Sequence, residues 1–289
     1  MKKKGLLIKT LALLVFRSRG GILNTFDSLI SPKEYKIKTS LELEKIVNEL
    51  LELLAPYPSK SPLRLIGSQG DGGYLMANFD IKQAQFLISG GIETNNEFEY
   101  ELAELGIEGL QIDNSIDYPP KVHKNLKFIR ATLGLGENQS FSIDAYLDSV
   151  EHKNILLKLD IEGTELEVIN GIKIHNLEKV HSAVIELHDL DYLFLNEYRE
   201  KLLETLNHLK EAGLVPCFIS PNNVTSAEII GGILIPRNIE ITFTRRNRVK
   251  SKFSMKDFEP IIKKQKKNIN GISSININHI ILRRVVNNV

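Results

Sequence analysis

The chain predicts an α/β fold with a mostly parallel sheet and an antiparallel last strand. The clearest sign is in residues 155–188, where an apolar run, a short segment with helical spacing of apolar residues and a second apolar run follow one another. Such a unit normally forms two parallel strands joined by a helical crossover. The run at 239–244 alternates apolar and polar residues, and we expect it to be the last strand.

The charges are distributed unevenly along the 289 residues. The net charge is +1, but residues 1–36 hold eight basic and two acidic residues and residues 245–289 hold twelve and two, which leaves 17 basic and 32 acidic residues between them. An acidic body with basic ends predicts contact with something anionic, which could be a membrane surface, a nucleic acid or the body itself. We therefore divide the chain into a basic and apolar segment (1–36), a body (37–249) and a basic C-terminal extension (250–289).

The apolar run at 5–16 is too short to span a membrane, because a span needs about 20 apolar residues. It has basic flanks and no obvious cleavage site, so it could lie on an anionic leaflet or pack on the body as a frayed helix. We expect a cytoplasmic protein, with peripheral contact to the inner membrane face through the basic ends. Cys217 is the single cysteine and lies in an apolar run, which excludes an intramolecular disulfide and predicts a buried thiol.

The body begins with an expected helix after the capping box Thr39–Glu42, which ends at Pro56 and Pro58. Four glycines around Asp71 indicate a hairpin tip between two short strands. The apolar runs predict strands at 85–88, 110–112, 126–131, 155–159, 183–185, 214–219 (interrupted by Pro216) and 239–244. Helical periodicity predicts helices at 96–105, 140–147, 166–170 and 198–212, with a loop at 132–138.

Acidic residues and a histidine fall where two of these strands end. Asp160 and Glu162 follow the run at 155–159, and Glu186 and His188 follow the run at 183–185. In open α/β sheets the ligand lies in the crevice beyond the carboxyl ends of the strands. We therefore expect these four side chains to converge on one cleft.

The same region resembles a known family. Residues 157–171 read LKLDIEGTELEVING, which looks like the hallmark segment of FkbM-type S-adenosylmethionine-dependent methyltransferases. The Asp-Gly-Gly-Tyr turn at 71–74 resembles a feature of one FkbM-like subgroup, so Asp71 and Tyr74 are expected to border the ligand site. The resemblance covers roughly residues 60–246. It implies a Rossmann-like class I methyltransferase fold that uses S-adenosyl-L-methionine as cofactor.

The glycine loop after the first strand of the sheet is the predicted cofactor site, and its residues are Ser89, Gly90, Gly91 and Glu93. Glycines let a backbone approach a ligand, although a plain strand-to-helix turn is the alternative. There is no Gly-x-Gly-x-x-Gly fingerprint, which argues against a dinucleotide dehydrogenase.

Asp113 closes the second strand, where it could accept hydrogen bonds from both ribose hydroxyls of a cofactor. The alternatives are that Asp117 takes this role, or that Asp113 is a solvated loop acid. Ala131 and Thr132, at the end of the third strand, would lie near the adenine in this fold.

Methyl transfer from a sulfonium is an in-line displacement, so the protein mainly positions donor and acceptor. Asp160 and Glu162 are candidates for this positioning, His188 is the candidate base, and Glu186 could orient His188. Alternatively, Asp160 caps the next helix and His188 is a satisfied loop histidine. A divalent metal on Asp160, Glu162 and His188 is left open, but no ligand cluster demands one, so we predict no metal site.

The resemblance implies an enzyme that O-methylates a hydroxyl of a sugar or glycoconjugate, so the expected partner is a small-molecule or glycan acceptor. A non-catalytic module that binds the cofactor or a glycan is one alternative. A nucleic-acid methyltransferase that grips its substrate with the basic tail is another. The acidic body, and the absence of aromatic residues within the lysine run at 263–267, argue against the second alternative.

Overall fold

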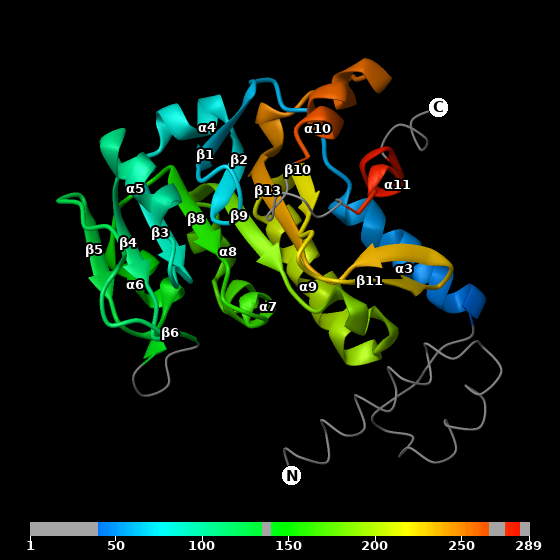
Figure 1. The fold of residues 1–289 in the computed structure, drawn as a ribbon, viewed down its shortest axis with the longest axis horizontal. Coiled ribbons are helices and arrows are strands. Elements are labelled where there is room, and N and C mark those ends of the chain that lie inside the picture. The colour runs from blue at the N-terminus through cyan, green and yellow to red at the C-terminus, as the bar shows by residue number, and fades with distance from the viewer. Residues whose placement is uncertain (1–39, 135–139, 266–274, 284–289) are drawn as a thin grey trace, which may run out of the picture.

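The fold is built around a central sheet of seven strands. The computed structural model describes residues 40–134, 140–265 and 275–283 (Figure 1). The strands of the sheet are β3 (Phe86–Gly90), β4 (Glu108–Ile112), β5 (Leu126–Ile129), β8 (Ile155–Leu159), β9 (Val180–Leu187), β10 (Leu214–Pro221) and β13 (Ile239–Arg245).

The sheet has the order β10-β13-β9-β8-β3-β4-β5. The pairs from β9 through β8, β3 and β4 to β5 are all parallel. β13, which comes last in the sequence, lies between β9 and β10 and is antiparallel to both. The predicted mostly parallel sheet with an antiparallel last strand is therefore confirmed.

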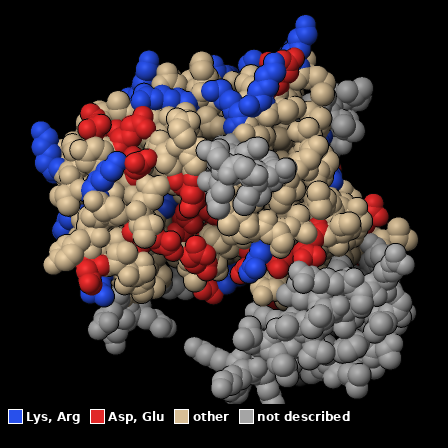
Figure 2. All heavy atoms as spheres, viewed as in Figure 1, with Lys and Arg blue, Asp and Glu red and all other residues tan. Residues whose placement is uncertain are grey.

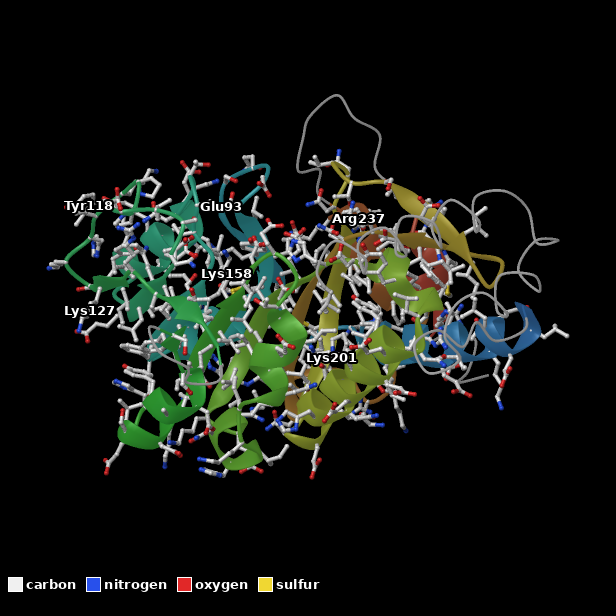
Figure 3. The ribbon with its side chains drawn as sticks, turned by 90° about the horizontal axis from the view of Figure 1, so that it is seen from below. Glu93, Tyr118, Lys127, Lys158, Lys201 and Arg237 are labelled. Carbon is white, nitrogen blue, oxygen red and sulfur yellow. The ribbon has the colours of Figure 1, made fainter. Side chains whose placement is uncertain are left out.

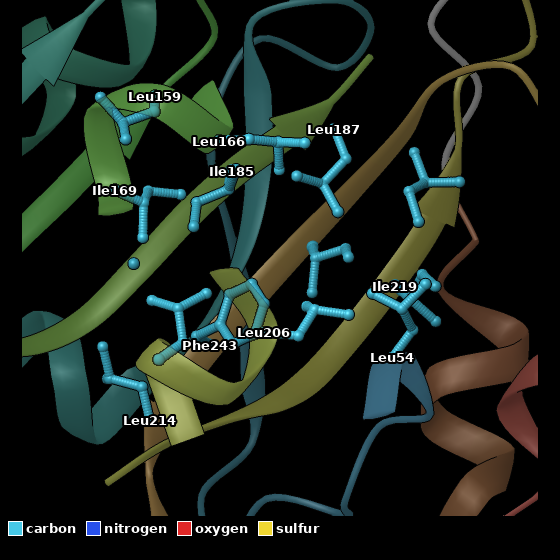
Figure 4. Packing of buried hydrophobic residues seen from close by; sticks show 14 of the residues in the cluster. Leu54, Leu159, Leu166, Ile169, Ile185, Leu187, Leu206, Leu214, Ile219 and Phe243 are labelled. Carbon is cyan, nitrogen blue, oxygen red and sulfur yellow. The ribbon is translucent and has the colours of Figure 1, made fainter. Parts of the chain in front are cut away.

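All strands of the sheet except the edge strand β5 are mostly buried on both faces, as is typical of the sheet in an α/β protein, whereas β5 is partly exposed. Alternate residues point to opposite sides: Leu156 and Val184 belong to one apolar cluster, whereas Leu157 and Ile185 belong to another. The smaller cluster receives side chains from α4 (Asn78–Gln83) and α5 (Glu97–Glu104). The larger cluster (Figure 4) receives them from α3 (Ser40–Leu54), α6 (Ile143–Ser149), α7 (Glu165–Asn170), α8 (Ile174–Leu177) and α9 (Asn196–Glu211).

Two hairpins flank the carboxyl edge of the sheet. β1 (Leu63–Gly67) and β2 (Gly73–Ala77) form the predicted hairpin around Asp71. β11 (Ala227–Ile230) and β12 (Ile233–Pro236) form a second hairpin, whose first strand the sequence did not predict. Ile229 of β11 is exposed. A strand with one solvated face gives only a weak apolar signal.

The predicted loop at 132–138 is partly wrong, because β6 (Thr132–Leu133) pairs in parallel with β7 (Ser140–Phe141). A two-residue strand is too short to show periodicity. Pro216 interrupts β10 as predicted, since the register of β10 against β13 shifts between Pro216 and Phe218. The thiol of Cys217 is fully buried, as expected, and burial raises its pKa well above the usual value.

Part of the C-terminal extension packs onto the body. η3 (Met255–Phe258), α10 (Glu259–Lys263) and α11 (Asn278–Ile281) contribute Phe258, Ile261, Ile280 and Ile281 to the larger apolar cluster. The short helix α11 therefore docks on the body through Ile280 and Ile281. No helix in the described ranges is long and apolar enough to cross a membrane. The predicted apolar segment at 5–16 and the cap residue Thr39 lie outside the described residues.

Phe258 tests whether this extension stabilises the whole fold. Its side chain is fully buried and packs edge-on against Phe253. We expect Phe258→Ala to lower the free energy of unfolding by about 3–5 kcal/mol, because it removes a large buried ring. Met255→Ala is the matched control, since Met255 lies on the same helical turn and is 50% exposed. Urea unfolding of both variants measures the difference, and equal stabilities would contradict a structural role for the extension.

Candidate functional site

The site lies at the carboxyl edge of the sheet, where strand order reverses between β3 and β8. Two cavities open there: the first, of about 240 Å³, lies beside Asp113, and the second, of about 270 Å³, lies beside Tyr74 and His188. They share the wall residues Gly91, Glu93, Asp160 and Glu162. On the face shown in Figure 2, acidic side chains gather in a hollow near the middle of the molecule. The cavities therefore adjoin, and their common wall is largely acidic.

Gly91 lies where the backbones at the ends of β3 and β8 pack closely together. Its φ angle is +78°, and a Cβ built on it would lie 1.6 Å from the carbonyl oxygen of Asp160. The Asp160 N–H also donates to the Gly90 carbonyl at 3.1 Å. Glycine is therefore required at 91 by the protein's own packing, whether or not a ligand approaches.

Two of the predicted loop residues lie behind this contact. Ser89 is fully buried in β3, and its hydroxyl donates to Glu99 of α5. A Cβ on Gly90 would collide with the side chain of Leu133. Ser89 and Gly90 line neither of the two cavities, whereas Gly91 and Glu93 line both.

Asp113 fastens the glycine loop to the end of β4. Its Oδ2 accepts hydrogen bonds from the N–H groups of Ile92 (2.7 Å) and Glu93 (2.9 Å). Its Oδ1 accepts from the N–H (2.7 Å) and the hydroxyl (2.6 Å) of Ser115. Burial alone would raise the pKa of Asp113, but these hydrogen bonds outweigh it and lower the pKa.

A carboxylate offers about four lone-pair sites, so these contacts occupy Asp113 fully. That Asp113 accepts hydrogen bonds from the ribose of a cofactor stays a prediction. It requires Ser115 or the glycine loop to give up one of its hydrogen bonds to Asp113. Asp117, the alternative, forms an exposed ion pair with Arg130 at 2.6 Å. Ala131 and Thr132, by contrast, line the first cavity beside Asp113.

The hairpin of β1 and β2 supplies Asp71 and Tyr74 to the second cavity. The buried Tyr74 hydroxyl donates to Asp160 Oδ2 at 2.8 Å. Burial, followed by the charge of Asp160, raises the pKa of Tyr74 well above its usual value, so the hydroxyl remains a donor. The sequence-distant Tyr74 therefore fixes the orientation of the Asp160 carboxylate.

The four acidic and histidine residues predicted to converge do so: Asp160, Glu162, Glu186 and His188 all line the second cavity. Glu162 has a φ angle of 55°, which turns the chain out of β8 and leaves its side chain 71% exposed. His188 is buried at the end of β9. Its Nε2 lies 3.5 Å from Glu162 Oε2, 3.8 Å from Glu186 Oε1 and 3.9 Å from Asp160 Oδ1.

Glu165 holds the other side of the His188 ring, a role that the sequence did not predict. The Nδ1–H of His188 donates to Glu165 Oε1 at 2.9 Å, because a carboxylate can only accept. Glu165 is buried at the start of α7 and accepts hydrogen bonds from the N–H groups of Ile161 and Gly163. The motif residues 161–165 thus form a turn whose carboxylate orients the histidine.

The charges of the cluster favour protonated states. Burial would lower the pKa of His188, but the hydrogen bond and charge of Glu165, with the charges of Glu186 and Asp160, raise it. Burial raises the pKa of Glu186, and the charges of Asp160 and Glu240 raise it further. The site therefore attracts positive charge.

Lys158 is the buried cation of the site, and Figure 3 places it inside the molecule beside the loop that carries Glu93. Its ammonium donates to the Gly91 carbonyl and lies 3.7 Å from Asp160 Oδ2. Burial would lower the pKa of Lys158, but the charges of Asp160 and Glu99 outweigh it. The sequence signal that could have identified Lys158 is a lysine inside an otherwise apolar strand.

Asn222 and Asn238 also line the second cavity, and each donates a hydrogen bond to Glu186 Oε1.

The strand order, the antiparallel β13 and the cavities at the switch point define a Rossmann-like α/β protein with the class I methyltransferase fold, as predicted. Residues 132–214, which carry the Asp160, Glu162, Glu186 and His188 cluster, match the family model of the methyltransferase FkbM domain. This match confirms the predicted resemblance to that family and supports a methyltransferase.

A search of curated proteins finds no match. Among solved structures, the chain is similar to a fibrillarin pre-rRNA processing protein of Methanococcus jannaschii, with 10% identity over 59% of this chain and 70% of that chain and a TM-score of 0.35. It is also similar to a candidate RNA methyltransferase from Pyrococcus horikoshii, with 10% identity over 55% of this chain and 72% of that chain and a TM-score of 0.28.

Gly91 provides a test of the contact between the ends of β3 and β8. We expect Gly91→Ala to prevent folding or to lower the free energy of unfolding by more than about 4 kcal/mol, because the strain of an alanine at positive φ adds to the collision of its Cβ with the Asp160 carbonyl. Gly106→Ala is the matched control, since Gly106 has a φ angle of +92° and nothing within 4 Å of its Cβ position. Gly106→Ala should lower the free energy of unfolding by only about 1–3 kcal/mol. Equal unfolding free energies for the two variants would show that the collision is relieved.

Asp113 provides a test of the loop attachment through its pH dependence. At pH 7 we expect Asp113→Asn to lower stability by about 1–3 kcal/mol, because an amide cannot accept all four hydrogen bonds. The folded pKa is lowered, so the stabilisation is present above the unfolded value of about 3.9 and is lost as the pH falls through the folded pKa.

The difference between wild type and Asp113→Asn should therefore shrink below about pH 4, measured by urea unfolding. Asp117→Asn removes an exposed carboxylate and should change stability by less than about 1 kcal/mol. If the stability difference between wild type and Asp113→Asn does not change with pH, the negative charge of Asp113 is not what holds the loop.

Proposed function

We propose that the protein is an S-adenosylmethionine-dependent methyltransferase that O-methylates a hydroxyl of a sugar or glycoconjugate. The observation that carries this proposal is the common wall of the two cavities at Gly91, Glu93, Asp160 and Glu162. A donor held in the first cavity and an acceptor held in the second would meet at that wall, which is the proximity that an in-line displacement needs. The family match at 132–214 supports methyl transfer as the reaction.

The residues of the first cavity fit the nucleoside end of the cofactor. Ile112, Ala131 and Leu133 give apolar surface for a flat base, and Asn114 and Ser115 provide polar groups beside it. The acidic wall suits the positively charged sulfonium and amino groups at the other end. When bound there, S-adenosylmethionine would supply an electrophilic methyl group.

The second cavity fits a hydroxyl-rich acceptor. Its lining includes the carboxylate of Asp71, the amides of Asn95, Asn222 and Asn238, and the hydroxyl of Thr225. Each of these groups can form hydrogen bonds with hydroxyl groups, and they come from four separate segments of the chain. This supports a polyhydroxyl acceptor more than a purely apolar one.

The acceptor hydroxyl must lose its proton as the new carbon–oxygen bond forms. His188 and the carboxylates around its Nε2 line the cavity at the required place, and Glu165 fixes the ring orientation. We assign the polarisation of the hydroxyl to His188, whose raised pKa favours the protonated ring, and the uptake of the proton to the carboxylates around its Nε2. Asp160, fixed by Tyr74, lies between this group and the glycine loop and would position the two reactants.

The proposal is tested by calorimetry and by methyl transfer. We expect wild-type protein to bind S-adenosylmethionine and S-adenosylhomocysteine, and Thr132→Trp to abolish both, because the exposed Thr132 lines the first cavity. Leu105→Trp is the control, since Leu105 is 48% exposed and outside both cavities.

His188→Gln should keep donor affinity within about threefold while lowering radiolabelled methyl transfer to a glycan hydroxyl by about 10²–10⁴-fold. Well-folded wild-type protein that binds neither compound would refute the enzyme proposal. Donor binding that survives Thr132→Trp would place the donor elsewhere. Unchanged transfer by His188→Gln would remove His188 from the chemistry.

A further inference from the structure

Three side chains of the second cavity have the spacing of ligands around one cation. Asp160, Glu186 and His188 each offer one ligand atom, and these atoms lie within 4.8 Å of one another. The separations from His188 Nε2 are 3.9 Å to Asp160 Oδ1 and 3.8 Å to Glu186 Oε1. Two atoms at about 2.1 Å from one ion are roughly 3.0 Å apart when adjacent and 4.2 Å apart when opposite in an octahedron. The observed separations are therefore too long for hydrogen bonds but suit a shared ion.

His188 is held as a metal-binding histidine normally is. Its side chain is 7% exposed, and its Nδ1–H is bound by Glu165. Its Nε2 faces the cavity, where the carboxylates of Glu162, Glu186 and Asp160 lie at 3.5–3.9 Å, and it makes no hydrogen bond within the described parts of the chain. A carboxylate on one ring nitrogen fixes the tautomer and the ring plane, which leaves the other nitrogen directed at the ion.

The two carboxylates are also held by neighbouring groups. Tyr74 and Lys158 occupy the Oδ2 side of Asp160, so its Oδ1 is the atom that faces His188. Glu186 Oε1 accepts from Asn222 at 2.9 Å and from Asn238 at 3.4 Å, and this same atom lies 3.8 Å from His188 Nε2, so an ion there would replace the longer of these two hydrogen bonds. Ligands whose rotamers are fixed by such partners lose little entropy when an ion binds.

Two buried carboxylates face each other beside this point. Glu186 of β9 lies directly opposite Glu240 of β13, and both are at least 95% buried. Like charges directly opposite in a sheet are destabilising. Lys158 is an ion-pair partner of Asp160 and His188 is one of Glu186, and a divalent ion beside His188 would add to this charge compensation.

We propose that Asp160, Glu186 and His188 hold one divalent cation in the wall of the second cavity. Imidazole with two carboxylates suits Mn²⁺, Fe²⁺ or Zn²⁺ better than Mg²⁺ or Ca²⁺, which favour oxygen ligands alone. The cavity side stays open, so an acceptor hydroxyl can complete the coordination and have its acidity increased. With the ion bound, the lone pair of His188 is engaged, and the exposed Glu162 is the nearest carboxylate that can take the proton.

Ion binding is tested on chelator-treated full-length protein with Mn²⁺ alone, without donor or acceptor. We expect the electron paramagnetic resonance signal of free Mn²⁺ to show one site per chain. Glu186→Gln and His188→Gln should each weaken Mn²⁺ binding by at least about 100-fold, and Glu165→Gln by about 10–100-fold. Glu93→Gln is the matched control, because it removes the same charge from the same cavity outside the cluster. It should change the Mn²⁺ dissociation constant by less than about threefold.

Glu186→Gln removes one of two opposed buried carboxylates, so this variant is expected to stay folded, which thermal unfolding without metal will check. The proposal is overturned if folded wild-type protein binds no Mn²⁺ at millimolar concentration. It is also overturned if Glu186→Gln and His188→Gln bind Mn²⁺ as wild type does, or if Glu93→Gln weakens binding as much as they do. Because no donor is present, failure here is separate from failure of the methyltransferase proposal.

Discussion

The contact between Gly91 and the carbonyl of Asp160 is the constraint on which the rest of the site depends. It joins the ends of β3 and β8, the two neighbouring strands at which the strand order of the sheet reverses. Asp113 holds the far side of the same loop, and the Lys158 ammonium binds the Gly91 carbonyl. The loop that follows β3 is thus held by residues at the ends of β4 and β8, so its part of the common wall is preorganised before any ligand arrives.

A rigid acidic wall carries an electrostatic cost, and the fold offsets this cost with hydrogen bonds from neutral groups. Tyr74 donates to Asp160, and Asn222 donates to Glu186. Glu165 is held by backbone N–H groups of its own turn. Each of these donors fixes a rotamer without adding positive charge, so the cluster keeps its attraction for a cation. This property would suit both the sulfonium of the proposed donor and the proposed metal ion.

The sequence predicted the sheet well because burial on both faces leaves continuous apolar runs, as in 155–159. It also placed Asp160, Glu162, Glu186 and His188 in one cleft, because parallel strands bring their carboxyl ends to one edge. Short strands such as β6 were missed, since two residues show no period.

The supporting residues of the site could not be predicted in the same way. Tyr74 is 86 residues away from the Asp160 that it orients, and Asn222 is 36 residues away from Glu186. Glu165 lies within the recognised motif, but its contact with His188 depends on the turn formed by Glu162 and Gly163 at positive φ. A one-dimensional pattern shows residue types at strand ends, whereas these roles depend on side-chain directions across the fold.

Asp113 shows that a residue at a predicted position can also carry a structural role that the sequence did not predict. An acid at the end of the second strand suits ribose recognition, but here its oxygens already accept hydrogen bonds from Ile92, Glu93 and Ser115. Ribose could replace the Ser115 hydroxyl at Oδ1 while Oδ2 continues to hold the loop, because the two oxygens serve different partners. Cofactor binding and loop rigidity would then be coupled through a single carboxylate. This coupling gives a physical reason for an acid at this position even when no ligand is bound.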